Sequence, residues 1–283
     1  MSTKRIAVVT GGNKGIGYEI VKYLCKKYAG IVYLTARNEG RGLNACEKLI
    51  LEGVKNPPKF HQLDIADDES IEKFRDYLKE THNGLDVLVN NAAIAYHPNS
   101  HVSFAEQAEK TMRINFTGTL NVCKALFPLL RPHARVVHVS SGSGRLGKIT
   151  NESLKMELTM PDLTESELVD LMQQFLDATK VGDHESKGWP NSTQPYADYA
   201  VSKIGLNILT EIQARDNPYD EDKDTLINCC CPGPCLTDMA GPHATKTATE
   251  GAETPVYLVL IPSGSEQPHG KYYTELKEAS WKY

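Results

Sequence analysis

The feature that most constrains the fold is a glycine-rich turn between an apolar run and a helical pattern near the N-terminus. Arg5–Thr10 is a short apolar run typical of a buried parallel strand. Gly11–Gly17 follows at once with the spacing G-x-x-x-G-x-G, and Tyr18–Leu24 has a helical pattern. Glycines permit a tight turn, and a helix N-terminus offers N–H donors to an anion. Glycine also collects in ordinary turns, but the position directly after a strand favours a dinucleotide-binding unit.

Strand-like runs alternate with helical patterns along the chain. The runs are Arg5–Thr10, Ile31–Thr35, Lys59–Gln62, Val87–Asn90, Arg135–Ser140, Leu226–Cys231 and, more weakly, Lys271–Tyr273. Helical patterns lie between them, including Ile71–Thr81 and a long one over Asn115–Phe127. The 283 residues, 40% of them hydrophobic, suit one sizeable core. We predict an α/β fold with a doubly wound parallel sheet (a Rossmann fold) in a single domain, residues 1–283.

The residues that follow the second strand-like run indicate which dinucleotide the protein binds. An acidic residue at its end would bind ribose hydroxyls and favour NAD. Here Ile31–Thr35 is followed by Ala36 and Arg37, and Lys14 in the glycine-rich turn adds a second cation. Two cations fit a ribose 2′-phosphate, because Arg binds phosphate through a bidentate, charge-assisted pair. We therefore predict NADP(H); the alternative is that both cations are solvated surface charges.

Tyr199 and Lys203 stand four residues apart, which places them one turn apart on the same face of a helix. A phenol titrates near pH 10, and a nearby cation stabilises the phenolate and lowers its pKa. The pair is therefore a candidate general acid, provided that a redox cofactor and an activating serine lie elsewhere in the chain. Alone, such a pair is common on solvated helices.

Together these motifs resemble the short-chain dehydrogenase/reductase family, and within it the monomeric NADPH-dependent carbonyl reductases. The resemblance spans almost the whole chain: Thr10–Gly17, Asn90–Ala92, Asn115, Val139–Ser141, Tyr199–Lys203, and Pro232-Gly233 with Thr237. The likeness to the carbonyl reductases adds Leu34–Arg37, Phe60–Ile65, Gly188–Pro190 and Thr237–Pro242. It implies a Rossmann fold and reduction of small carbonyl compounds by NADPH.

The resemblance also implies a set of site residues. The expected catalytic residues are Asn115, Ser141, Tyr199 and Lys203. The expected cofactor-binding residues are Gly11, Asn13, Lys14, Gly15, Ile16, Gly17, Arg37, Asp64, Ile65, Asn91, Tyr199, Lys203, Pro232, Gly233, Cys235 and Thr237. Two of them have alternatives: Asn91 could cap a turn, and Asp64 could cap the helix that begins near Ser70.

The expected roles follow the charge that develops during reduction. Ser141, with Ser140 as its structural neighbour, would hydrogen-bond the carbonyl oxygen, and Tyr199 would protonate it. Lys203 would lower the pKa of Tyr199 and hold the nicotinamide ribose. Asn115 would disturb its helix and hold a water linked to Lys203; the alternative is an amide that satisfies local backbone groups.

The chain departs from ordinary family members in three places. Ala93 stands where the family pattern has glycine, which slightly crowds the backbone beside the cofactor. Tyr199 follows Ser141 by 58 positions, a long gap that we assign to a helical insertion, residues 146–195. Asn191–Asp198, directly before Tyr199, is longer than in the close relatives, so the substrate preference could differ.

The insertion carries its own helical signals. Thr164–Glu167 has the capping-box pattern, and an apolar stripe follows at helical spacing, formed by Leu168, Met172, Phe175 and Leu176. The stripe predicts core packing. In the carbonyl reductases a similar insert covers the surface used for tetramer formation, so the resemblance implies a monomer.

Composition excludes several classes of protein. A formal charge of −5 argues against a nucleic-acid partner, and no apolar run approaches the roughly 18 residues of a membrane span. Seven cysteines, three of them adjacent (Cys229–Cys231), suggest a reducing cytoplasm. Cys231 and Cys235 lack a matching cluster of His or Cys, so we expect no metal site.

Three functions are compared. The leading one is NADPH-dependent reduction of quinones, aldehydes and ketones. The alternatives are a narrower reductase of one pterin, prostaglandin or steroid ketone, and a non-catalytic NADP(H)-binding protein. The complete set of catalytic residues argues against the last. Tyr96–Pro98 and Gln107 fall where the relatives contact glutathione conjugates, but His97 reads as a solvated loop residue and we assign it no such role.

Overall fold

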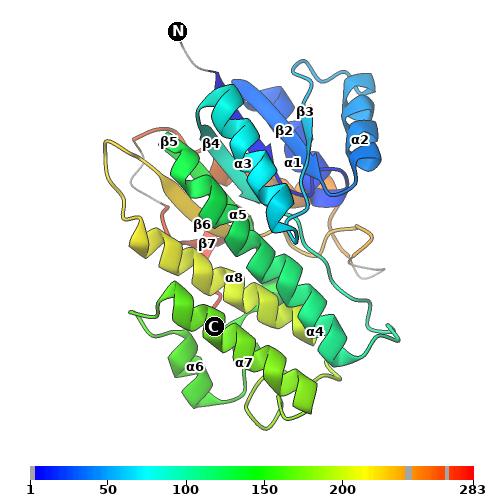
Figure 1. Cartoon of the computed structure of the whole chain (residues 1–283), viewed down its shortest axis with the longest axis vertical. Helices are drawn as coiled ribbons and strands as arrows, with labels where there is room; N and C mark the ends of the chain where they lie inside the picture. The colour runs from blue at the N-terminus through cyan, green and yellow to red at the C-terminus, as the bar shows by residue number, and fades with distance from the viewer. Residues whose placement is uncertain (1–3, 240–243, 265–267) are drawn as a thin grey trace.

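The computed structural model describes residues 4–239, 244–264 and 268–283, so residues 240–242 of the motif Thr237–Pro242 lie outside the described part. An eight-stranded sheet runs through it in the order β3-β2-β1-β4-β5-β6-β7-β8, with every neighbouring pair parallel except β7 and β8 (Figure 1). The strands are β1 (Arg5–Val9), β2 (Gly30–Ala36), β3 (Lys59–Gln62), β4 (Leu85–Asn90), β5 (Leu130–Val139), β6 (Leu226–Cys231), β7 (Tyr272–Thr274) and β8 (Lys277–Ala279). The predicted doubly wound parallel sheet is confirmed.

The strand predictions fail mainly at the ends of β5 and at β8. β5 begins at Leu130 rather than Arg135, because its first residues include Pro132 and a left-handed His133 (φ +66°), which weaken the strand pattern. β8 was not predicted: its three residues, Lys-Glu-Ala, have low strand propensity, and the strand pairs only with β7 at the sheet edge. The weak run at Lys271–Tyr273 is β7, displaced by one residue.

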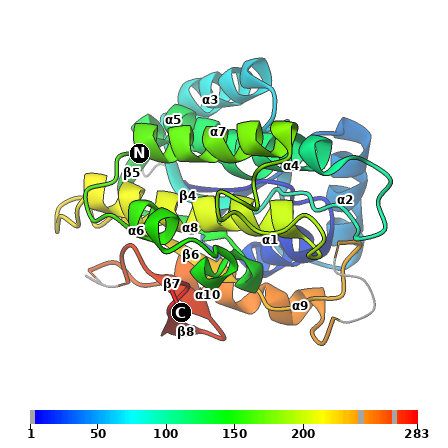
Figure 2. The same ribbon diagram turned by 90° about the horizontal axis from the view of Figure 1, so that it is seen from below.

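Helices cover both faces of the sheet, as Figures 1 and 2 show together. One face of the sheet packs against α1 (Gly15–Lys27), α2 (Glu39–Leu51) and α10 (Glu253–Val259), with the short α9 (Ala248–Gly251) beside α1. The other packs against α3 (Asp68–His82), α5 (Thr119–Leu126) and α8 (Ala197–Asp216), with α4 (Phe104–Met112) against α8. In β1, Ala7 and Val9 pack on the face covered by α1, α2 and α10, whereas Ile6 and Val8 pack on the face covered by α3 and α5. Burial on both sides explains why the strand reads as a continuous apolar run.

The long helix predicted over Asn115–Phe127 is divided. The segment η1 (Arg113–Gly118) is a π-helical turn between α4 and α5, and η2 (Phe127–Leu129) is a 3₁₀ turn after α5. A single π turn inside a helix is uncommon and often marks a functional site. The expectation that Asn115 lies at a disturbance of its helix is therefore confirmed.

The segment between β5 and α8 folds as expected from its helical signals. It begins with the 3₁₀ turns η3 (Gly142–Gly144) and η4 (Leu146–Lys148), followed by α6 (Glu152–Leu158) and α7 (Glu165–Val181). Thr164 and Glu167 form the predicted capping box at the start of α7. Leu168, Met172 and Phe175 are buried, and α7 lies on α4 and α8 (Figure 1).

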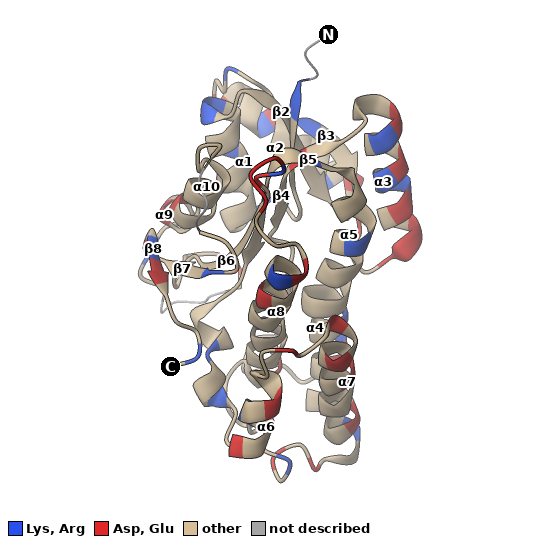
Figure 3. Cartoon of the chain, turned by 90° about the vertical axis from the view of Figure 1, so that its left-hand side faces the viewer, with Lys and Arg blue, Asp and Glu red and all other residues tan. Residues whose placement is uncertain are grey.

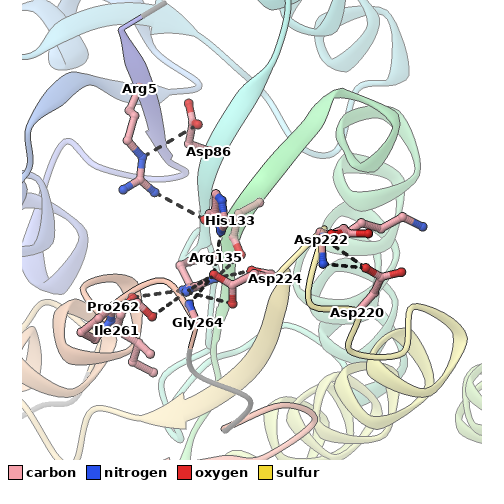
Figure 4. Close-up of polar contacts among 12 residues, drawn as sticks. Arg5, Asp86, His133, Arg135, Asp220, Asp222, Asp224, Ile261, Pro262 and Gly264 are labelled. Atoms are coloured by element: carbon pink, nitrogen blue, oxygen red, sulfur yellow. Dashed lines mark hydrogen bonds and ion pairs between the residues drawn. The ribbon is translucent and has the colours of Figure 1, made fainter.

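Buried ionic contacts close the amino end of the sheet (Figure 4). Arg135 and Asp224 form a buried ion pair at 3.2 Å, in which the Asp224 side chain is 0% exposed. Arg135 also donates to the carbonyls of Ile261 and Pro262, so it ties β5 to the segment after α10. This cluster lies near the amino ends of β5 and β6, whereas the glycine-rich turn lies at the carboxyl end of β1. It holds the loops at the amino ends of the strands together.

Charges on the surface are mixed. Figure 3 shows Lys and Arg interspersed with Asp and Glu, for example along α3. In the three described ranges, no helix is long and apolar enough to cross a bilayer.

Candidate active site

The predicted site residues gather at the carboxyl edge of the sheet. Most of them follow the strands directly: the glycine-rich turn follows β1, Arg37 follows β2, Asp64 comes after β3, Asn91 follows β4 and Ser141 comes after β5. The loop after β6 carries Pro232, Gly233, Cys235 and Thr237. The strand order reverses between β1 and β4, and ligands of open α/β sheets bind beyond the carboxyl ends at this point.

The glycine-rich turn is tightly constrained. Gly11 (φ +63°) and Gly15 (φ +56°) adopt left-handed backbone conformations. A Cβ at Gly17 would lie 2.4 Å from both Asn91 Nδ2 and the Gly11 carbonyl, so only glycine fits there. Asn91 Nδ2 donates to the Thr10 carbonyl at 2.9 Å, and the Thr10 hydroxyl accepts from the Asn91 N–H at 3.0 Å. Thr10, whose role the sequence analysis missed, thus fixes β4 to the turn.

The start of α1 suits a bound phosphate. Its N-cap, Lys14, makes no side-chain cap, and the first turn, which is fully described, carries no acidic side chain. The first N–H groups of the helix therefore keep their hydrogen-bonding capacity and the positive end of the helix dipole. Asn13 and Ile16 are partly buried beside this turn. The arrangement fits the pyrophosphate of a dinucleotide.

The end of the site near β2 and β3 carries the two predicted cations. Arg37 is exposed, and Lys14 Nζ lies 2.7 Å from Asp238 Oδ2, a carboxylate that the sequence analysis did not place there. Asp64 accepts from the Ala66 N–H at 3.0 Å, and Ile65 is buried. Asp67, not Asp64, caps α3, so the alternative interpretation of Asp64 as the helix cap is wrong.

The loop after β6 reaches the glycine-rich turn from the other side. The Thr237 methyl lies 3.3 Å from the position of a Cβ on Gly15. Gly233 (φ +82°) donates its N–H to Cys231 Sγ, and Cys235 Sγ donates to the Pro232 carbonyl, both at 3.3 Å. These contacts hold the loop against the carboxyl edge of the sheet. Among the described residues, no cluster of three or more His, Cys, Asp or Glu could hold a metal.

The predicted catalytic residues Ser141 and Tyr199 are in contact. The Ser141 and Tyr199 hydroxyls are hydrogen-bonded to each other. Ser140, the neighbouring candidate, is buried, and its hydroxyl donates to Asn207 Oδ1 at 2.6 Å. Ser141 is therefore the serine whose hydroxyl can share a carbonyl oxygen with Tyr199.

Lys203 lies behind this pair. Its Nζ donates to the Val139 carbonyl at 2.8 Å and lies 5.5 Å from the centroid of the Tyr199 ring. Burial lowers the pKa of Lys203 to about 8. Desolvation by the surrounding protein raises the pKa of Tyr199 to about 12, although the Ser141 hydrogen bond opposes this rise. Burial and the Ser141 hydrogen bond are the two largest causes that act on this pKa, so the expected lowering of the pKa of Tyr199 by Lys203 stays a prediction.

The Asn115 amide contacts two other segments of the chain. Its Oδ1 accepts from the Ile94 N–H at 2.8 Å, and its Nδ2 donates to the Ile94 carbonyl at 2.9 Å and to Ser202 Oγ at 3.1 Å. The amide therefore links η1 to the segment after β4 and to α8, and its backbone partner, Ile94, is 21 residues away and not local as the alternative interpretation supposed. The water relay to Lys203 stays a prediction.

The remaining singled-out segments border this site. Ala93 is partly exposed near Asn91. Within the segment Asn191–Asp198, Tyr196 has a left-handed backbone conformation (φ +62°) and stands directly before α8. Asp198, next to Tyr199, is buried and accepts from Thr111 Oγ1 at 2.6 Å. Gln107 Nε2 donates to the Val102 carbonyl, and His97 is exposed.

Comparisons with known proteins agree with this geometry. Residues 5–153 match the short chain dehydrogenase family. The chain is 49% identical over 282 residues to carbonyl reductase (NADPH) 1 of Mus musculus, and 48% identical over 282 residues to that of Rattus norvegicus, with 99% of each chain covered. Among solved structures, salutaridine reductase from Papaver somniferum has a TM-score of 0.85 and 34% identity, covering 95% of this chain and 99% of that one. The resemblance seen in the motifs is confirmed, and the chain belongs to the short-chain dehydrogenase/reductase family.

Proposed function

We propose that this protein reduces quinones, aldehydes and ketones to alcohols, with NADPH as the hydride donor. The observation that carries the proposal is the hydrogen bond between the Ser141 and Tyr199 hydroxyls, with Lys203 behind the tyrosine ring. The names of the mouse and rat relatives, carbonyl reductase (NADPH) 1, support the same chemistry.

The protein's part in the reaction is to stabilise and neutralise negative charge. NADPH supplies the hydride to the carbonyl carbon. As charge grows on the carbonyl oxygen, the Ser141 hydroxyl donates a hydrogen bond to it. Tyr199, which is protonated at pH 7, transfers its proton to that oxygen. The phenolate that remains is stabilised by the Lys203 ammonium.

The resemblance assigns the residues that would hold NADP(H). The turn Gly11–Gly17 and the first N–H groups of α1 would bind its pyrophosphate, Lys14 and Arg37 its 2′-phosphate, and Asp64 and Ile65 its adenine. Asn91 supports the turn, Lys203 would hold the nicotinamide ribose, and the loop from Pro232 to Thr237 would hold the carboxamide. The donors available fit the group: N–H groups and two cations for phosphates.

A narrower substrate range is the second candidate. The segment Asn191–Asp198 directly precedes Tyr199, and its last residues set the start of α8 through the left-handed Tyr196. Comparing kcat/KM for a quinone, a pterin and a steroid ketone separates the two candidates, because a narrow reductase would favour one of them by orders of magnitude.

The test is NADPH consumption with menadione, followed at 340 nm. We expect turnover by the wild-type protein, and Tyr199→Phe should bind NADPH normally while losing most of its turnover. Tyr257→Phe, on the opposite side of the sheet in α10, is the matched control. Wild-type rates in Tyr199→Phe would show that the proton comes from another group.

We further propose that the protein is a cytoplasmic monomer. α6 and α7 lie within residues 146–195, which we assign to the insertion, and α7 packs over α4 and α8. The resemblance implies that such an insertion covers the surface used for tetramer formation. The seven cysteines are free and buried, which fits a reducing compartment. Light scattering at micromolar concentration tests whether the protein is a monomer, and a mass of four chains would contradict that proposal.

A further inference from the structure

We propose that Asn207 is a positioning residue that fixes the Ser141 hydroxyl against Tyr199. The inference rests on the proposed function. Tyr199, Lys203 and Asn207 occupy three successive turns on one face of α8. Each contacts one of three consecutive residues at the end of β5: Tyr199 contacts Ser141, Lys203 binds the Val139 carbonyl, and Asn207 binds Ser140.

Both the oxygen and the nitrogen of the Asn207 side-chain amide form hydrogen bonds. Its Oδ1 accepts from the Ser140 hydroxyl at 2.6 Å, and its Nδ2 donates to the Gly144 carbonyl at 2.9 Å. These two partners lie on either side of Ser141 in the chain. Asn207 is 0% exposed and Ser140 is 1% exposed, so water does not compete for these bonds. One side chain therefore fixes the backbone before and after the proposed catalytic serine.

The backbone after Ser141 has little freedom to compensate. A Cβ on Gly144 would lie 2.8 Å from Lys203 Cβ, so the turn η3 lies directly on the backbone of α8. Ser141 Oγ accepts from the Ser143 N–H at 3.1 Å, a contact within the same turn. If the Gly144 carbonyl is released, η3 and the Ser141 hydroxyl move together. A displacement of about 1 Å at a reacting group can lower a rate about 100-fold.

Three variants separate the two contacts of the amide. Asn207→Leu removes both, Asn207→Asp keeps an acceptor for Ser140 but loses the donor to Gly144, and Ser140→Ala removes only the first contact. We expect Asn207→Leu to lower kcat by about 10-fold to 100-fold. The dissociation constant of NADPH should change by less than about 2-fold, because the glycine-rich turn is untouched. The double variant Ser140→Ala/Asn207→Leu should be no slower than Asn207→Leu alone, since both changes act on one link.

The matched control is Gln213→Leu. Gln213 is another buried amide on α8 that bonds to β5, through His138 Nε2 at 3.0 Å, but three residues before Ser141. It should lower the melting temperature by a similar amount while leaving kcat within about 2-fold of the wild type. The pH at which kcat/KM falls should not move in either variant, because Lys203 keeps its contacts.

The outcomes are distinct. A kcat loss in Asn207→Leu that Gln213→Leu does not share, with NADPH binding intact, supports the positioning role. Equal kcat in the two variants, or wild-type kcat in both Asn207→Asp and Ser140→Ala if Asn207→Leu does not fold, overturns it. Absence of turnover in the wild-type protein would overturn the proposed function itself, and the inference with it.

Discussion

The Lys203 ammonium donates to the Val139 carbonyl at 2.8 Å, two residues before Ser141, and its neighbour Tyr199 has a pKa moved in the opposite direction. Burial disfavours the charged form of each group, so the pKa of Lys203 falls to about 8 and that of Tyr199 rises to about 12. At pH 7 the lysine is therefore charged and the phenol is protonated. These are the protonation states that a proton donor for carbonyl reduction requires.

The first prediction concerns the pH dependence of reduction. Because the lowered pKa of Lys203 lies at about 8, its ammonium is lost as the pH rises through that value. We expect kcat/KM for the carbonyl substrate, which reports groups of the free enzyme, to fall above about pH 8. The fall should follow one ionisation, because Tyr199 titrates only near pH 12. Rates measured from pH 6 to 10 in constant-ionic-strength buffers check this, and a profile that stays flat to pH 10 would assign the charge to another group.

The second prediction concerns cofactor selection. Lys14 pairs with Asp238 at 2.7 Å, and both side chains are exposed, so solvent screens the pair and it is weak. Binding of a 2′-phosphate by Lys14 competes with this pair. We expect Asp238→Asn to tighten NADPH binding by up to about 5-fold. Lys14→Ala and Arg37→Ala should weaken NADPH binding by about 10-fold or more and leave NADH binding unchanged. Fluorescence titration with both cofactors measures this, and equal losses for NADH would contradict the assignment.

The sequence predicted the elements whose signals are local. The apolar runs of β1 and β6, the glycine-rich turn and the capping box at Thr164 each lie within a few residues, and each was found. A turn that needs left-handed backbone at Gly11 and Gly15 has few alternatives. The pair Tyr199 and Lys203 was also local, because one helical turn separates the two residues.

Contacts between distant segments could not be predicted. Thr10 with Asn91, Lys14 with Asp238, and Ser140 with Asn207 join residues that no spacing rule connects. The raised pKa of Tyr199 could not be predicted either, because the sequence does not show how deeply the fold buries this phenol. The π turn at Asn115 has no pattern of its own, and its place came from the resemblance alone.

The third prediction concerns the buried ion pair at the amino end of the sheet. Asp224→Asn leaves Arg135 buried without its charge partner, and we expect the free energy of unfolding to fall by about 3–5 kcal/mol. The ion pair lies at the opposite edge from Tyr199, so kcat should not change. Urea denaturation measures the effect. Asp222→Asn, an exposed carboxylate two residues earlier, is the control and should change stability by less than about 0.5 kcal/mol. Equal stability of the two variants would show that the pair contributes little.

The last prediction concerns His138, which is 0% exposed in β5 and bonds to Gln213 and Asn90. Burial lowers its pKa from 6.5 to about 4, although the bond to Gln213 opposes this. Below pH 6.5 the unfolded chain binds a proton that the folded protein does not, so stability falls as the pH drops toward 4. Each pH unit across this interval is worth about 1.4 kcal/mol, so the loss is roughly 3 kcal/mol.

His138→Asn should remove this loss, which urea titrations at pH 7, 5.5 and 4.5 would detect as a flatter dependence of unfolding free energy on pH. Titration of the Asp224 carboxylate does not contribute to the change in unfolding free energy over this pH range. Burial alone would raise its pKa, but hydrogen bonds from His133, the Gly264 N–H and Arg135 hold that pKa below 3.8. Its contribution is therefore lost only at lower pH. An unchanged slope between pH 6.5 and 4.5 in His138→Asn would mean that His138 is already protonated in the folded protein.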